Sequence, residues 1–177
     1  MTHERRLKWT MPIAGVLAVA AGAMLVIKCR GEPDGELMSG DGVTGGTVSV
    51  FLFAGQQNQL VEVRNETRIF AGDLLQAGYT SPVDGYGAVL SLDGAGNANT
   101  YVPAVGSAMV LLPAGERRSF PASTQLDDVL GSERIAVIWC HRPQPLAPFL
   151  AELQRSGDLA RRADCAIRVT AVSKTAR

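Results

Sequence analysis

Short apolar runs separated by turn residues are the feature that most constrains the fold of this 177-residue chain. From Thr47 onward these runs are rich in β-branched and aromatic side chains, which favour strands. Nineteen glycines and nine prolines supply turn residues. Strands are predicted at residues 47–53, 60–63, 73–81, 87–92, 99–102, 108–112, 124–127, 133–140 and 166–172. Because strands recur about every ten residues with little helix between them, we predict a mainly β domain over residues 47–173, either an antiparallel β-sandwich or an open barrel.

Four stretches of this domain carry more specific signals. Residues 133–140 are almost wholly apolar, which predicts a central strand. Residues 93–97 place glycine and asparagine between two strands and predict a hairpin loop. Apolar side chains three and four apart in residues 145–153 predict one short C-terminal helix that packs on the sheet. Apolar and polar side chains alternate in residues 166–172, which predicts a half-buried strand.

An apolar segment near the N-terminus, residues 11–27, predicts a single transmembrane helix. At about 1.5 Å per residue it spans roughly 25 Å, a workable length for the hydrocarbon core. A mild excess of basic residues before the segment predicts that residues 1–10 form a cytoplasmic tail. We therefore expect a single-pass inner-membrane protein that contacts the lipid bilayer through residues 11–27. Residues 28–46, a Gly-rich and acidic stretch, are expected to be a flexible linker to a domain in the periplasm.

Two other fates of the N-terminal segment remain open. Cleavage after Ala20 or Ala23 would remove it as a signal peptide and give a secreted form. Residues 24–27 are apolar and would become a new terminus, which favours the uncleaved anchor. Cys29 suggests acylation as a lipoprotein, but the residues directly before it are larger than such a signal requires.

Two cysteines in the predicted domain could form a disulfide. Cys140 ends one predicted strand and Cys165 directly precedes another. A periplasmic domain lies in an oxidising compartment, where disulfides persist. We therefore predict a Cys140–Cys165 bond if the two strands are neighbours. The alternative is two separate buried thiols, since cysteine packs well as a small apolar residue.

No catalytic, cofactor-binding or metal-binding residue is predicted. Cys140 and His141 are adjacent, but neighbours in a strand point to opposite faces and could not act as nucleophile and base. The cysteines and His141 lack the spacing of a zinc site. Residues 93–99 lack the acidic density of a calcium loop, and Gly94 and Gly96 lack the third glycine of a dinucleotide fingerprint. We expect no cofactor and no enzymatic activity.

The balance of charged side chains argues against a nucleic-acid partner. The chain has 17 basic and 17 acidic side chains and therefore no formal net charge. Nothing in this balance attracts the chain to a polyanion, so we expect no nucleic-acid partner.

A series of turn and strand-start motifs runs through the domain in order. They are Ala71-Gly72-Asp73, Asp84-Gly85-Tyr86, Leu92-Asp93-Gly94-Ala95-Gly96, Tyr101-Val102-Pro103, Ala114-Gly115-Glu116 and Gly131-Ser132-Glu133-Arg134-Ile135. Over roughly residues 47–145 the chain resembles the bacterial domain of unknown function 4384 family, although Gly87-Ala88 stands where bulkier residues are usual. The resemblance implies a β-rich accessory module, often attached to caspase-like peptidases, kinases or membrane anchors, with no assigned activity.

These observations favour a membrane-anchored envelope protein whose β domain is a non-catalytic module that binds another protein or has a structural role. Two alternatives remain. One is an accessory subunit of a sigma-factor or peptidase signalling system, and the other is an enzyme of unrecognised type. The sequence does not identify the partner.

Overall fold

The computed structural model describes residues 47–56 and 59–177. The predicted cytoplasmic tail, transmembrane helix and linker, residues 1–10, 11–27 and 28–46, lie outside the described residues. Within the described part of the chain, no helix has both the length and the apolar character needed to cross a membrane.

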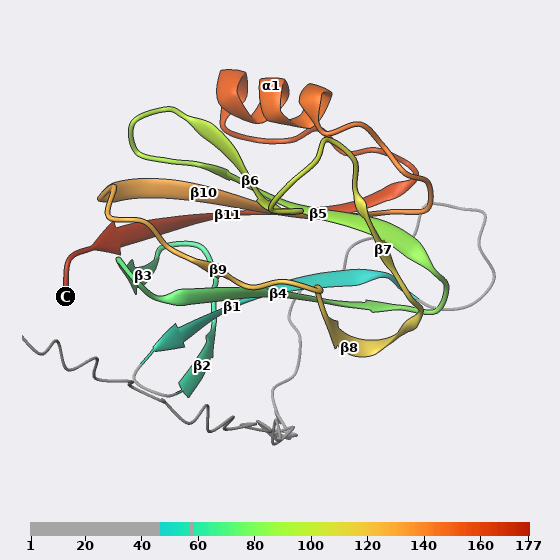
Figure 1. Cartoon of the computed structure of the whole chain (residues 1–177), viewed down its shortest axis with the longest axis horizontal. Helices are drawn as coiled ribbons and strands as arrows, with labels where there is room; N and C mark the ends of the chain where they lie inside the picture. Colours follow the sequence, from blue (N-terminus) through green and yellow to red (C-terminus); the bar gives the residue numbers. More distant parts are fainter. Residues whose placement is uncertain (1–46, 57–58) are drawn as a thin grey trace, which may run out of the picture. The chain divides into compact units, whose positions relative to one another are not determined.

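The described residues form two β-sheets and one short helix (Figure 1). The elements are β1 (Ser49–Gln56), β2 (Gln59–Glu62), β3 (Thr67–Phe70), β4 (Leu74–Ser81), β5 (Gly85–Leu92), β6 (Ala98–Val102), β7 (Val110–Leu112), β8 (Gly115–Ser119), β9 (Thr124–Gln125), β10 (Gly131–Cys140), α1 (Ala147–Ser156) and β11 (Cys165–Thr175). The first sheet has the order β2-β1-β4-β8, and β9 also pairs with β4. The second has the order β3-β11-β10-β5-β6, and β7 also pairs with β5.

The main core lies between the two sheets. Alternate residues of β1 are buried, namely Val50, Leu52 and Ala54, because successive side chains of a strand point to opposite faces. They belong to one cluster with Val137 and Trp139 of β10 in the second sheet. The mainly β, sandwich-like prediction is therefore confirmed, and the described strands form two sheets that do not close into a barrel.

A second core lies between the second sheet and α1, which Figure 1 shows above β6 and β5. Phe149 and Leu153, one turn apart on the helix, are fully buried against this sheet. Pro148 lies in the first turn, where its missing N–H costs no hydrogen bond. Gly157 ends the helix in a left-handed conformation with φ of 70°. The predicted helix on the sheet is confirmed.

Strand β10 is central, as predicted, because it pairs with β11 on one side and β5 on the other. The hairpin loop at residues 93–97 is also confirmed, since β5 and β6 pair antiparallel around it.

Two features differ from the prediction. First, β3 pairs with β11 in parallel, so the sheets are not wholly antiparallel. Second, β11 is half-buried as predicted, but its fully buried face is the one with polar side chains: Thr170 and Lys174 are 2% and 1% exposed, whereas Ser173 is exposed. The first sheet covers them, while α1 covers the opposite face of the same sheet, on which Ile167 lies.

Candidate functional site

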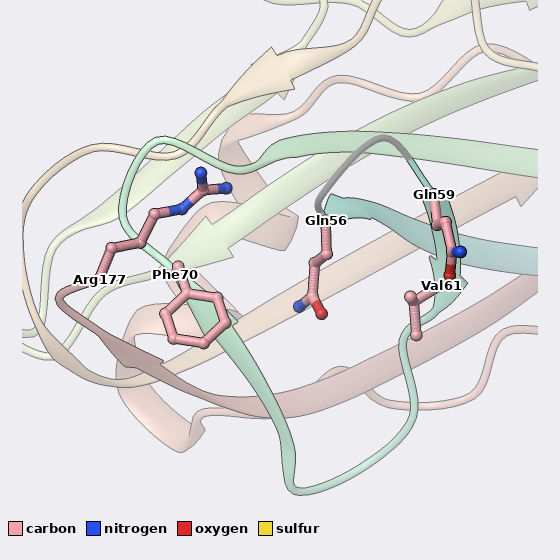
Figure 2. Close-up of a pocket in the computed structure, with 5 residues that line it drawn as sticks. All are labelled: Gln56, Gln59, Val61, Phe70 and Arg177. Carbon is pink, nitrogen blue, oxygen red and sulfur yellow. The ribbon is translucent and has the colours of Figure 1, made fainter.

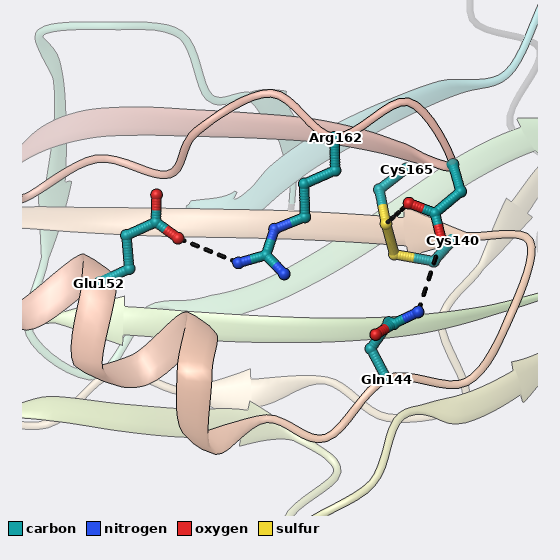
Figure 3. Close-up of a disulfide and its surroundings, with 6 residues drawn as sticks. Cys140, Gln144, Glu152, Arg162 and Cys165 are labelled. Carbon is teal, nitrogen blue, oxygen red and sulfur yellow. Dashed lines mark hydrogen bonds and ion pairs between the residues drawn. A yellow bond between two sulfur atoms is a disulfide. The ribbon is translucent and has the colours of Figure 1, made fainter.

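The two domain cysteines lie directly opposite each other. Cys140 ends β10, Cys165 begins β11, and the two are partners in the antiparallel register. Their Cα atoms are 4.0 Å apart and their sulfur atoms are bonded (Figure 3). The two strands are therefore neighbours, which was the condition for the predicted disulfide.

Polar contacts beside the disulfide hold the segment between α1 and β11 against the helix. Arg162 pairs with Glu152 at 3.0 Å, as Figure 3 shows, and its guanidinium carbon lies 3.8 Å from the centre of the Phe149 ring. Glu152 also accepts a hydrogen bond from the backbone N–H of Ala160 at 2.7 Å. This backbone bond, followed by the bond from Arg162, lowers the pKa of Glu152. The helix is therefore tied to the strand that carries the second cysteine.

Cys140 and His141 face opposite sides of the second sheet. Cys140 belongs to the cluster under α1, whereas the His141 ring packs edge-on against Trp139 with centroids 4.7 Å apart. The cysteine sulfur is bonded to Cys165. In the described residues, no three or more His, Cys, Asp or Glu side chains come together to hold a metal ion.

The outer face of the first sheet carries an apolar patch that the sequence analysis did not single out. We call Phe51, Phe53, Leu60 and Leu74 the outer patch. The two phenylalanine ring centroids are 6.5 Å apart, and both rings lie beside Gly78, where the absent side chain leaves room. Leu60 and Leu74 are 55% and 48% exposed and lie in register on either side of Gly55.

The outer patch reaches the edge of its sheet. It spans β2, β1 and β4, and β2 pairs only with β1 among the described strands. The far edge of β2 therefore presents backbone N–H and C=O groups that no described strand uses. An apolar face next to an open strand edge can bind an extended segment of another protein.

A pocket of about 470 Å³ lies beside the ends of β1, β2, β3 and β11. Figure 2 shows Gln59 and Val61 on one side of it, Phe70 and Arg177 on the other, and Gln56 between them. Gln56 spans the two sheets, because its side-chain amide donates to the backbone carbonyl of Arg68 on β3 at 3.0 Å. The guanidinium of Arg177 is held 2.5 Å from the buried carboxylate of Asp73. The side-chain amide of Gln56 and the guanidinium of Arg177 are therefore already bonded to other groups of the protein.

A buried polar cluster lies between the sheets at the end of β11. The Lys174 amine is 2.7 Å from Glu133 Oε2 and also contacts Asp127 Oδ1. Tyr101 donates its hydroxyl to Glu133 Oε1 at 2.5 Å. Burial alone would lower the pKa of Lys174, but the contacts with the two carboxylates outweigh it and raise that pKa. Burial and the bond to Glu133 raise the pKa of Tyr101.

These residues escaped the sequence analysis because they come from distant segments. No spacing motif joins Leu60 to Leu74 or Tyr101 to Lys174. One signal was present, since Thr170, Val172 and Lys174 alternate with the apolar residues of the last strand. A lysine on the same face as a buried valine indicates a paired, buried amine once both faces of the strand are known to be covered.

Comparison with known proteins found no matching family model, no matching curated protein and no matching solved structure.

Proposed function

We propose that this protein is a membrane-anchored envelope protein whose β domain is a non-catalytic module that binds another envelope protein. The observation that carries the proposal is the outer patch beside the open edge of β2. Residues 11–27 would be the anchor and residues 28–46 the linker. The proposal includes membership of the domain of unknown function 4384 family, which would make the β domain an accessory module.

The exposure of the outer patch supports a binding role. Apolar residues scattered singly over a surface are normal, but neighbouring ones that form a continuous patch mark interaction sites more often. Here two half-buried aromatic rings and two exposed leucines share one face of three adjacent strands. A partner that covers this face would bury apolar surface, which stabilises a complex by roughly 25 cal/mol for each Å² buried.

The disulfide supports the expected compartment. Disulfides form and persist in oxidising environments such as the bacterial periplasm and are rare in the cytosol. The Cys140–Cys165 bond joins the central strand β10 to its neighbour β11. Anchoring by residues 11–27 would place the domain outside the cytoplasm, in the oxidising compartment where such a bond forms.

Crosslinking in intact membranes tests the proposal. Full-length protein is crosslinked and purified, and its partners are identified by mass spectrometry. Leu60→Ser and Leu74→Ser remove apolar surface from the outer patch. Leu111→Ser is the matched control, because Leu111 is 59% exposed but lies on β7 in the other sheet. We expect one adduct that both patch variants weaken at least about tenfold, the equivalent of about 1.4 kcal/mol, and that the control retains.

Two results would contradict the proposal. An adduct unchanged in all three variants would show that the partner binds elsewhere. The absence of any adduct with wild-type protein would remove the evidence for a protein partner and favour the enzyme alternative. Identification of a sigma-factor regulator or a peptidase as the partner would place the protein in a signalling system.

A further inference from the structure

Lys174 is the polar residue whose position most needs an explanation. Its side chain is 1% exposed, although lysine is almost never fully buried unless paired. It projects from β11 into the space between the sheets, on the same face as Val172. Its amine contacts two carboxylates at once, those of Glu133 and Asp127.

The two carboxylates have different surroundings. Glu133 is also 1% exposed, lies on β10, and is held by the hydroxyl of Tyr101 at 2.5 Å. Asp127 follows β9 on the connection to β10, and its side chain is 46% exposed. Its Oδ1 also accepts a hydrogen bond from the backbone N–H of Val129 at 3.2 Å. One carboxylate is thus enclosed and fixed, and the other can release a water molecule to solvent.

We propose that Lys174 and Asp127 condense to an intramolecular isopeptide bond, with Glu133 carrying protons between the reacting groups. The ammonium of Lys174 and the carboxylate of Asp127 become one amide and one water molecule. A proton first passes from Nζ to the Asp127 carboxylate within their contact, and the free amine then attacks Cγ. Glu133 takes the next proton from the nitrogen and returns it to the departing oxygen, which leaves as water. No oxidant, reductant or cofactor is consumed, and Glu133 is regenerated.

The geometry favours this reaction in two ways. The nucleophile and the carbon it attacks belong to groups already in contact. Folding has therefore already removed the translational and rotational freedom whose loss slows an intermolecular condensation. Burial by itself disfavours the charged form of the Lys174 amine, and the reaction needs that amine neutral. The carboxylates hold the lysine charged at rest, so we expect the bond to form slowly after folding rather than during it.

The bond would have a structural effect on the whole domain. Asp127 lies where the chain leaves β9, which pairs with the first sheet, for β10 in the second. Lys174 lies 47 residues away, near the end of β11. An amide between them would link the sheet connection to the last strand and resist proteases and mechanical load. This inference does not depend on the proposed binding function.

Peptide mapping of the full-length protein, reduced and digested with trypsin, tests the inference. Trypsin cuts after Arg and after Lys with a free amine, so Asp127 falls in the peptide of residues 119–134. Lys174 ends the peptide 169–174 when its amine is free and lies within residues 169–177 when its amine is bonded. We expect one species that joins these peptides, with a mass one water below their sum and no cleavage after Lys174. Wild-type protein that yields the separate peptides, with trypsin cleavage after Lys174, would overturn the inference.

Variants define the residues involved. Lys174→Arg keeps the charge but removes the amine, and Asp127→Ala removes the carbon that is attacked, so each should abolish the joined species. Asp128→Ala, at the adjacent exposed carboxylate, is the control and should retain it. Glu133→Gln should slow its appearance at least about tenfold in protein whose circular dichroism matches wild type. A joined species that survives Asp127→Ala, or full-rate formation in folded Glu133→Gln, would contradict the assigned roles.

Discussion

Single residues set the conformation of the turns in this domain, and Asp93 shows how. Its Oδ1 accepts hydrogen bonds from the backbone N–H groups of Ala95 at 2.9 Å and Asn97 at 2.8 Å. Its Oδ2 accepts from the Asn97 side chain at 3.1 Å. The backbone bond from Asn97 makes the largest contribution to lowering the pKa of Asp93. The charged carboxylate therefore stabilises the loop between β5 and β6.

We predict that Asp93→Asn lowers the free energy of unfolding by about 1.5–3 kcal/mol at pH 7, the range for hydrogen bonds to a charged group. The pKa of Asp93 is lower in the folded state, so its contribution is present above the unfolded value of about 4 and lost as the pH falls through the folded value. Urea unfolding measures the difference in the free energy of unfolding between the variant and wild type. This difference should be smaller in acid than at pH 7. Asp128→Asn, in an exposed position, is the control, and a difference independent of pH would contradict the prediction.

A second residue-scale prediction concerns close packing at Gly85. An added Cβ would lie 2.3 Å from ring atoms of Trp139, which is 1% exposed in the main core. Gly85→Ala should destabilise the domain by about 1–3 kcal/mol, the usual effect of overpacking. Gly55→Ala, whose Cβ would meet its nearest neighbour at 3.5 Å, should change stability much less. Urea unfolding of both variants checks this, and equal effects would show that the contact with Trp139 is not the cause.

At the scale of elements, strands with strong hydrophobic signals were predictable and weak ones were not. The apolar run at residues 133–140 identified β10, and the 3.6-residue period identified α1. By contrast, β8 has the sequence Gly-Glu-Arg-Arg-Ser and is mostly exposed. It is a strand because it pairs with β4, and that partner is distant in sequence. β3 was missed for a related reason, since it is short and its partner is the final strand.

The disulfide belongs to the element scale because it joins two strands. We predict that replacing Cys140 and Cys165 together by alanine lowers the free energy of unfolding by about 3–4 kcal/mol, since the closed loop has a sequence separation of 25. The measurement is urea unfolding of the double variant against oxidised wild type. Labelling of denatured, non-reduced protein should find no free thiol at either position. Two labelled thiols there in protein from the envelope would contradict the bond.

On the scale of the whole molecule, the topology decides which faces are buried. The chain passes from the first sheet to the second and back several times, so both faces of the second sheet become covered. This burial is why Lys174 and Glu133 lie in the interior, although the sequence around them gives alternating polar residues. The outer face of the first sheet has no covering layer among the described residues, which leaves the outer patch exposed.

A topology experiment tests the expected membrane arrangement. Residues 11–27 are predicted to span the membrane with the N-terminus in the cytoplasm. A reporter that is active only outside the cytoplasm, fused after Arg177, should be active and should fractionate with the membrane. Activity of a reporter that works only in the cytoplasm would contradict this arrangement. A mature N-terminus that follows Ala20 or Ala23 would instead support the secreted form.

The amino-acid sequence by itself determined the mainly β class, the central apolar strand, the hairpin loop at residues 93–97 and the short helix on the sheet. These depend on local periodicity and turn chemistry, which neighbouring residues specify. Only the tertiary structure decided the parallel pairing of β3 with β11, the contact of Lys174 with Asp127 and Glu133, and the exposure of Leu60 beside Leu74. Each joins residues from separate segments, and their proximity arises only when the two sheets and α1 pack together.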